Sequence, residues 1–298
     1  MNTDFRLIQI EAPRKKTKRP TGKINWKPLE KPTLRVLSLG AGVQSSALYL
    51  MACAGKIMPK PDVAIFSDTG CEPPYVYEYL GYLASKGSHH IPIIQASKGN
   101  LMTDILRSKR GHRFATMPLH VRNDEGKHAL LRRQCTREYK LEPIEQKVRE
   151  LLGAQPRQRI KGVAEVWIGI STDEAIRVKP SRNRWMSNYH PLIDLGMSRA
   201  DCLSWLQSNG YELPQKSSCI VCPYHDNAFW LNLKENHPAE FQQAVEFDRE
   251  IRSGLKSVDC NAYLHRSLQP LDAIDFASLI GQPEPDQFLG ECEGMCGV

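Results

Sequence analysis

The chain has 298 residues, of which 41% are hydrophobic and 24% are charged, with nine cysteines and a net charge of +7. This length and composition exclude a disordered or fibrous protein and allow one large domain with appendages, or two domains. No apolar stretch reaches membrane-spanning length and no apolar signal core follows the basic N-terminus, so we expect a cytoplasmic protein without a membrane partner.

The positive charge is concentrated in two segments. Residues 14–27 contain seven Lys or Arg and no acid, so their charge of +7 equals the net charge of the whole chain. They belong to a proline-containing stretch at 1–32 that we expect to be a basic flexible arm. Residues 107–140 carry ten Lys or Arg against three acids. Both segments are candidate contacts for a nucleic acid, although a solvated tail and a surface loop would have the same composition.

From residue 34 the pattern alternates between strands and helices, which predicts an α/β fold with a doubly wound, mostly parallel sheet over residues 33–225. We expect residues 97–134, which are rich in glycine and positive charge, to form a loop or short helices over the site. A helical C-terminal subdomain at 226–284 and a cysteine-containing tail at 285–298 follow. The expected strands are 34–39, 62–67, 91–95 and 165–170, and the expected helices are 44–54, 74–86, 138–152, 198–208, 226–236 and 238–253.

The first strand runs into a glycine-rich turn that is a candidate anion-binding site. Glycines let the backbone approach an anion, the first N–H groups of the following helix point at it, and serine hydroxyls add donors. The second strand brings an Asp-Thr-Gly turn to the same edge of the sheet, where ligands of open α/β sheets bind. An ordinary strand-to-helix turn is the alternative. The candidate nucleotide-binding residues here are Ser38, Gly40, Ala41, Gly42, Gln44, Ser45, Ser46, Asp68, Thr69 and Gly70.

Cys219 and Cys222 form a C-x-x-C pair with His225 three residues further on. Two thiolates at this spacing can hold one metal centre, and in a reducing compartment the spacing argues against a disulfide framework. A redox or incidental C-x-x-C is the alternative. Three cysteines in apolar or mixed surroundings, Cys53, Cys202 and Cys260, are interpreted as small core residues. Cys71 directly follows the Asp-Thr-Gly turn.

Three segments in this order, LSLGAGVQSSAL, FSDTG and CTREYKLEP, resemble the phosphoadenosine phosphosulfate (PAPS) reductases of the PP-loop ATP pyrophosphatase superfamily, over about residues 34–225. The resemblance implies an adenine nucleotide alpha-hydrolase-like, Rossmann-like fold. It also implies an adenine nucleotide ligand, which is ATP, adenosine phosphosulfate (APS) or PAPS.

The same resemblance supplies a third metal ligand. Cys135 aligns with the first cysteine of a Cys-Cys pair that holds an iron–sulfur cluster in related reductases, and Thr136 replaces the second. A 4Fe–4S cluster on Cys135, Cys219 and Cys222 would leave one iron open, or would take a fourth ligand from His225, Cys292 or Cys296. Three thiolates with His225 would equally suit Zn²⁺.

Two further segments compare with the superfamily. Gln44 stands where ATP pyrophosphatases carry an aspartate that helps to hold Mg²⁺, and a neutral amide is a poor ligand for this ion, so Mg²⁺ is an optional cofactor and the reductase branch is favoured. A later segment resembles the Gly-hydrophobic-Arg-x-x-Glu motif, with Ser171 in place of the arginine, and its cations are candidate contacts to phosphate or sulfate. The candidate nucleotide contacts in this segment are Gly169, Glu174, Arg177 and Arg182.

The C-terminal tail contains two candidate catalytic thiols, Cys292 and Cys296. Glu291-Cys292 resembles the start of the Glu-Cys-Gly tail whose thiol is the nucleophile of PAPS reductases, and Glu293 interrupts the match. A thiolate on such a tail can attack a bound sulfonucleotide. A disulfide between the two cysteines, or metal binding by them, is the alternative.

The leading functional hypothesis is therefore a sulfonucleotide (APS or PAPS) reductase, or a related sulfur-transfer enzyme, that uses a thiol, a metal centre and a thiol reductant. The second is an ATP pyrophosphatase that adenylates or thiolates a nucleic acid. The third is a non-catalytic nucleotide-binding accessory protein, such as a CRISPR-associated PAPS reductase-like subunit.

Overall fold

The computed structural model describes residues 24–112, 116–122, 126–155, 157–255, 258 and 260–282. Its centre is a six-stranded sheet in the order β1-β8-β7-β2-β3-β4, in which all paired strands are parallel. This confirms the predicted α/β fold with a parallel sheet. The strands are β1 (Ile24–Asn25), β2 (Leu34–Leu39), β3 (Val63–Asp68), β4 (Ile93–Ser97), β7 (Ala164–Ile168) and β8 (Met186–Tyr189).

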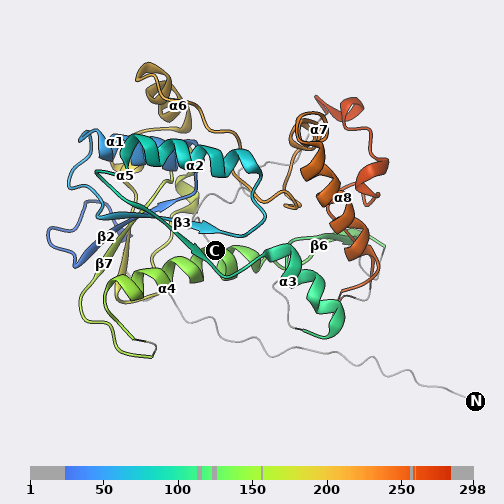
Figure 1. The fold of residues 1–298 in the computed structure, drawn as a ribbon, viewed down its shortest axis with the longest axis horizontal. Helices are drawn as coiled ribbons and strands as arrows, with labels where there is room; N and C mark the ends of the chain where they lie inside the picture. Colours follow the sequence, from blue (N-terminus) through green and yellow to red (C-terminus); the bar gives the residue numbers. More distant parts are fainter. Residues whose placement is uncertain are drawn as a thin grey trace, which may run out of the picture.

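Helices cover both faces of this sheet, as the doubly wound arrangement requires. On one face lie α1 (Val43–Cys53) and α2 (Pro74–Gly87), with α6 (Arg199–Ser208) and the short α5 (Pro191–Asp194) near them, and on the other lies α4 (Glu142–Leu151) (Figure 1). Successive residues of β2 alternate between the two cores: Leu37 packs with the α1 and α2 side chains, whereas Val36 packs with Ile144 of α4.

A second group of elements lies beside the sheet and contains α3 (Leu101–Arg107), α7 (Asn227–Asn236) and α8 (Pro238–Arg252) (Figure 1). A small antiparallel sheet, in the order β6-β5-β9, belongs to the same group. One hydrophobic cluster joins Ile105 and Val121 to Trp230 and Phe247. The segment 97–134, expected to be a loop or short helices, thus contains the short helix α3 and also an unexpected hairpin, and both pack on the C-terminal helices. The strands are β5 (His120–Arg122), β6 (His128–Leu130) and β9 (Ala262–Tyr263).

The remaining elements are single helical turns. A π-helical turn at Thr136–Leu141 precedes α4, so regular α-helix begins at Glu142, later than the expected start at 138. Short 3₁₀ turns lie at Ser108–Arg110, Thr172–Arg177, Leu271–Ala273 and Ala277–Leu279. Within the described part of the chain, no helix is long and apolar enough to span a bilayer.

Two strands of the large sheet were not expected, and both lie at one of its edges. β8 has the polar sequence Met-Ser-Asn-Tyr, and β1 lies inside the stretch expected to be a flexible arm. Two polar groups of β8 have partners outside the strand: the Ser187 hydroxyl accepts from the Asn25 side chain, and the Asn188 amide nitrogen donates to the carbonyl oxygen of Lys179 at 3.0 Å. These partners let polar side chains occupy a buried strand.

Candidate functional site

The carboxyl ends of β2 and β7 mark the ligand-binding position of this sheet. From β2 the chain proceeds outward to β3 and β4 and then returns by way of α4 to β7, on the other side of β2. Such a reversal of strand order creates a crevice, and ligands of open α/β sheets bind there. The glycine-rich turn leaves β2 at this point and therefore lies at this crevice.

Gly169 at the end of β7 packs directly against this turn. A Cβ atom on Gly169 would lie 3.0 Å from the backbone nitrogen of Ser45, closer than ordinary van der Waals contact. The lack of a side chain therefore allows the two strand ends to approach each other. It also places Gly169 in the crevice, and the contact of Gly169 with a nucleotide stays a prediction.

The turn itself leaves its helical N–H groups without a side-chain cap. Gly42 is the N-cap residue of α1, and no side chain accepts a hydrogen bond from the first turn. Ala41 adopts a left-handed backbone with φ of +57°, which is uncommon for a residue with a side chain. The Ser45 hydroxyl accepts from the backbone N–H of Gly40 at 3.2 Å, whereas the buried Ser46 hydroxyl has no partner among the described residues. The turn is thus a fixed loop with donors that a phosphate can accept from.

The side chain of Gln44 is used within the protein. It is fully buried, its Nε2 donates to Glu174 Oε2 at 3.2 Å, and its Oε1 accepts from Arg199 at 2.9 Å. Glu174 in turn forms an ion pair with Arg177. The residues predicted to bind nucleotide at positions 44, 174 and 177 are therefore brought together, and they form one hydrogen-bonded chain from the turn to the cationic segment after β7.

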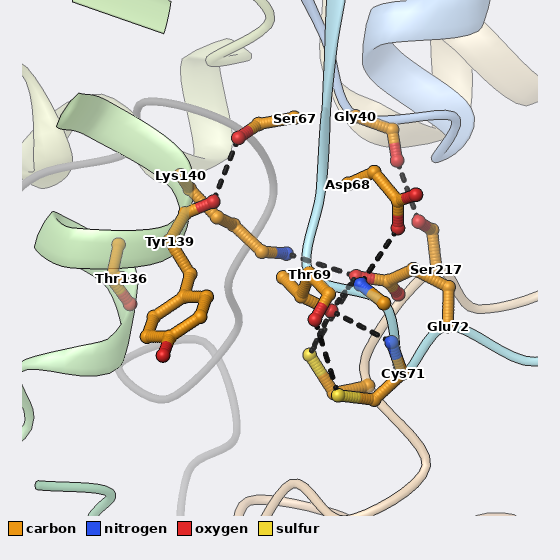
Figure 2. Close-up of polar contacts among 12 residues, drawn as sticks. Gly40, Ser67, Asp68, Thr69, Cys71, Glu72, Thr136, Tyr139, Lys140 and Ser217 are labelled. Atoms are coloured by element: carbon orange, nitrogen blue, oxygen red, sulfur yellow. Dashed lines mark hydrogen bonds and ion pairs between the residues drawn. The ribbon is translucent and has the colours of Figure 1, made fainter. Parts of the chain in front are cut away.

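The Asp-Thr-Gly turn at the end of β3 has a fixed carboxylate. Asp68 Oδ1 accepts from the backbone N–H of Gly70 at 2.8 Å (Figure 2). It also accepts from the hydroxyl of Tyr77 at 2.8 Å. Burial and the neighbouring Asp68 carboxylate raise the pKa of Tyr77, so this hydroxyl stays protonated and remains a donor. The carboxylate is held at the sheet edge beside the glycine-rich turn.

The segment that carries the C-x-x-C pair is attached to both turns. The Ser217 hydroxyl donates to the carbonyl oxygen of Gly40 at 2.6 Å (Figure 2). Ile220 N–H donates to the carbonyl oxygen of Cys71 at 2.8 Å. The Cys219 sulfur lies 3.1 Å from the Thr69 hydroxyl. Residues about 150 positions apart are thereby joined at one edge of the sheet.

Cys135, Cys219 and Cys222 line a common pocket with a cavity volume of about 30 Å³, which we call the cysteine pocket. Its walls are mostly apolar, and Thr69 and Lys140 also line it. The structure thus brings together the three predicted thiol ligands, which come from two distant segments. Among the described residues, no three His, Cys, Asp or Glu side chains are already arranged around a single-ion site.

His225, predicted as an alternative fourth ligand, does not line this pocket. Its Nε2 lies 2.8 Å from the carbonyl oxygen of Cys219, and its ring stacks on Phe229 with centroids 3.4 Å apart. Burial holds the pKa of His225 well below its ordinary value. The ring is therefore a neutral packing element of the C-terminal helices. The other alternative ligands and candidate nucleophiles, Cys292 and Cys296, lie outside the described residues.

Three residues that the sequence did not single out as ligands surround Cys219. Glu72 Oε1 lies 3.6 Å from the Cys219 sulfur and 3.9 Å from the ammonium of Lys140, in a buried cluster (Figure 2). A hydrogen bond with Cys71, burial and the Glu72 carboxylate raise the pKa of the Cys219 thiol, and the same hydrogen bond lowers the pKa of Cys71. The sequence signals were the position of Glu72 beside the Asp-Thr-Gly-Cys turn and that of Lys140 in the CTREYKLEP segment.

No protein-family model and no curated protein matches the chain. Among solved structures, the chain is similar to phosphoadenylyl-sulfate (PAPS) reductase from Candida auris in its phosphate complex. The two share 17% sequence identity with a TM-score of 0.40, and the match covers 62% of this chain and 76% of that chain.

Proposed function

We propose that the chain is an adenine-nucleotide-binding enzyme of the PAPS reductase type, with reduction of a sulfonucleotide as its reaction. One observation carries this proposal: the cysteine pocket shares Thr69 with the turn at the end of β3, and its C-x-x-C segment is hydrogen-bonded to Gly40. Sulfur chemistry would therefore take place directly beside a nucleotide held at the glycine-rich turn.

Different groups at this edge of the sheet would bind different parts of the nucleotide. The backbone N–H groups at 42–45 would hold the phosphate, since a helix N-terminus favours an anion. The Lys140 ammonium lies between this edge and the cysteine pocket, where it would stabilise negative charge on the leaving phosphate. Asp68, fixed by Tyr77, would accept a hydrogen bond from the nucleoside.

The proposed reaction uses two thiols in turn. A tail thiolate, Cys292 or Cys296, attacks the outer sulfur of the sulfonucleotide; a sulfur–sulfur bond forms, the sulfur–oxygen bond breaks, and the nucleotide phosphate leaves with the electron pair. A thiol of an external reductant then attacks the cysteine sulfur. A mixed disulfide forms between the reductant and the tail cysteine, and sulfite leaves. A second thiol of the reductant then attacks this mixed disulfide and releases the tail thiolate, so that the dithiol is oxidised to a disulfide and supplies both electrons.

The cysteine pocket fits a metal centre. Three thiols in an apolar cavity are donors for iron–sulfur clusters and for Zn²⁺. Of these two groups, the resemblance to iron–sulfur reductases favours a 4Fe–4S cluster. When bound on Cys135, Cys219 and Cys222, such a cluster would supply one iron with an open coordination position.

Anaerobic purification with an absorption spectrum and iron and sulfide analysis tests the metal centre. Cys135→Ala, Cys219→Ala and Cys222→Ala should each lose the metal, whereas Cys202→Ala, which changes a buried thiol in the α1 core, should retain it. Equal metal content in all four variants would contradict the assignment.

The reaction is tested by supplying ATP, APS and PAPS separately with a dithiol reductant. We expect sulfite release from APS or PAPS and no pyrophosphate release from ATP. Pyrophosphate release would instead support an enzyme that adenylates or thiolates a nucleic acid. Tight nucleotide binding without turnover would support a non-catalytic accessory protein.

A nucleic-acid substrate is the second candidate, and one observation favours it. Arg133 and Lys140, from the basic segment 107–140, line the cysteine pocket, and the Arg133 guanidinium lies 5.3 Å from the ring centroid of Tyr224. Cations beside an aromatic ring suit a nucleotide in a strand. Binding of tRNA or single-stranded RNA that weakens steeply with salt, and that Arg133→Ala reduces, would support this candidate.

A further inference from the structure

A second pocket lies beside the nucleotide edge, at the carboxyl ends of β7 and β8, and faces α4. Its cavity volume is about 40 Å³. This is room for about three or four water molecules, the size of one tetrahedral oxyanion and too small for a nucleoside. We call it the β8 pocket. The charged and polar residues that line it include Arg177, Lys179, Arg182, Glu145, Asn188 and His190.

Two buried polar side chains in this pocket lack partners. Both ring nitrogens of His190 and the Oδ1 atom of Asn188 have no hydrogen-bond partner among the described residues. The Asn188 amide nitrogen already donates to the carbonyl oxygen of Lys179 at 3.0 Å, which fixes the side chain. Unpaired buried polar atoms are costly, so their retention indicates a partner that enters from solution.

The unpaired atoms comprise one donor and two acceptors. Burial lowers the pKa of His190 to about 4, so at neutral pH the imidazole is neutral and offers one N–H and one lone pair. Asn188 Oδ1 is an acceptor only. The Glu145 carboxyl, whose pKa is raised by burial, lines the same pocket.

The occupant must therefore carry negative oxygens for the cations and a proton for the acceptors. Inorganic phosphate at pH 7 keeps a P–OH group, and a phosphomonoester is partly protonated because its second pKa is about 6. Sulfate and sulfo groups carry no proton at this pH. Acceptor atoms inside a cationic pocket therefore favour phosphate over sulfate.

We propose that the β8 pocket is a phosphate subsite that discriminates against sulfate. The guanidinium and ammonium groups on the loop after β7 neutralise the anion, the His190 N–H donates to one of its oxygens, and Asn188 Oδ1 accepts its proton. The chain from Arg177 through Glu174 to Gln44 connects this subsite to the glycine-rich turn. The inference rests on the proposed function only for the source of the phosphate, which is either free in solution or attached to the nucleotide.

Calorimetric titration of the full chain with inorganic phosphate and with sulfate, at pH 7 and constant ionic strength, tests the discrimination without any variant. We expect phosphate to bind about tenfold or more tightly than sulfate, the effect of one well-placed hydrogen bond to a charged group. Equal affinity for the two anions, or no phosphate binding, would overturn the proposal.

Variants locate the site. His190→Leu and Asn188→Leu should each lower phosphate affinity about tenfold while sulfate affinity changes by less than about twofold. Lys179→Ala should weaken both anions, and Arg184→Ala, which removes a nearby exposed cation outside the pocket, should weaken neither. The thermal stability of His190→Leu should not fall, because an unpaired polar group is replaced by an apolar one. Unchanged phosphate affinity in both leucine variants would place the anion elsewhere and contradict the proposal.

Titration with AMP and with adenosine 3′,5′-bisphosphate separates this inference from the proposed function. If His190→Leu binds AMP as well as the unmodified chain does but no longer binds phosphate, the subsite is a site for free phosphate. If the bisphosphate binds more tightly than AMP and this difference is lost in His190→Leu, the subsite holds a phosphate of the nucleotide. AMP binding without any phosphate discrimination refutes the subsite alone, and phosphate discrimination without any nucleotide binding refutes the proposed function alone.

Discussion

The Ser217 hydroxyl donates a hydrogen bond of 2.6 Å to the carbonyl oxygen of Gly40. This contact joins the first residue of the glycine-rich turn to the segment that carries Cys219 and Cys222. Any reaction between a bound nucleotide and a group in the cysteine pocket depends on the two segments keeping this relative position.

The contribution of this hydrogen bond to stability can be measured by comparing Ser217 with the neighbouring Ser218. Ser217→Ala should lower the free energy of unfolding by about 1 kcal/mol, because a buried carbonyl loses its donor. Ser218→Ala should cost less, because the Ser218 hydroxyl is buried and has no partner among the described residues. Urea denaturation of both variants checks this order. The reverse order would show that the contact contributes nothing to stability.

The protein should need the neutral amide of Gln44 for full stability, because the Glu174 carboxylate faces it. Gln44→Glu would bring two carboxylates together where Gln44 Nε2 now lies 3.2 Å from Glu174 Oε2, and should lower the free energy of unfolding by about 1 to 3 kcal/mol at neutral pH. Repulsion raises the pKa of one of the two carboxyls, so the loss should grow as the pH rises and shrink below about pH 5. Denaturation between pH 5 and pH 8 measures it.

A compensating change provides the control for this prediction. Gln44→Glu combined with Glu174→Gln restores one amide and one carboxylate and should recover most of the stability. Failure of the double variant to recover would mean that the loss arises from Arg199, which donates to the Gln44 oxygen at 2.9 Å, and not from Glu174.

Gly169→Ala should disturb the glycine-rich turn. The added Cβ would meet the backbone of Ser45 at 3.0 Å, and relief of such a clash against backbone costs about 1 to 3 kcal/mol. Affinity for AMP should fall with it, because the turn must move. Gly81→Ala in α2 is the matched control: nothing lies within 4 Å of its added Cβ, and this variant should be more stable by about 0.5 to 1 kcal/mol. Equal nucleotide affinity in both variants would remove Gly169 from the site.

The large sheet was predictable where burial and periodicity agree. The expected strand at 34–39 coincides with β2, and the helix expected at 74–86 ends one residue before α2 does. β8 was missed because its Ser187 and Asn188 resemble loop residues, and their partners, the Asn25 side chain and the Lys179 carbonyl, lie outside the strand. β1 was hidden by the charge around it, since pairing at a sheet edge depends on the partner strand and not on local composition.

The candidate site was predictable to the level of its motifs. Gly40 to Ser46, Asp68 and the three cysteines are identified by spacing and resemblance, and the structure brings them to one edge. The Glu72 and Lys140 cluster and the unpaired His190 could not be predicted, because a lone charged or histidine residue has no periodic signal. Only the folded chain shows which of these residues are buried together.

The pH dependence of stability should report on His120, which anchors the cysteine segment to β5. Its Nε2 lies 3.1 Å from the carbonyl oxygen of Pro223, the residue after Cys222, and burial lowers the pKa of His120 to about 4. The unfolded chain binds a proton near pH 6.5 and the folded chain does not until near pH 4, so stability is present above pH 6.5 and is lost as the pH falls toward 4. At pH 5 the loss from this residue should be about 2 kcal/mol relative to pH 7. Urea denaturation at both pH values measures this loss of stability. His120→Gln should reduce the difference in stability between pH 7 and pH 5 by that amount. If the variant has the same pH dependence as the unmodified chain, His120 is not the titrating group.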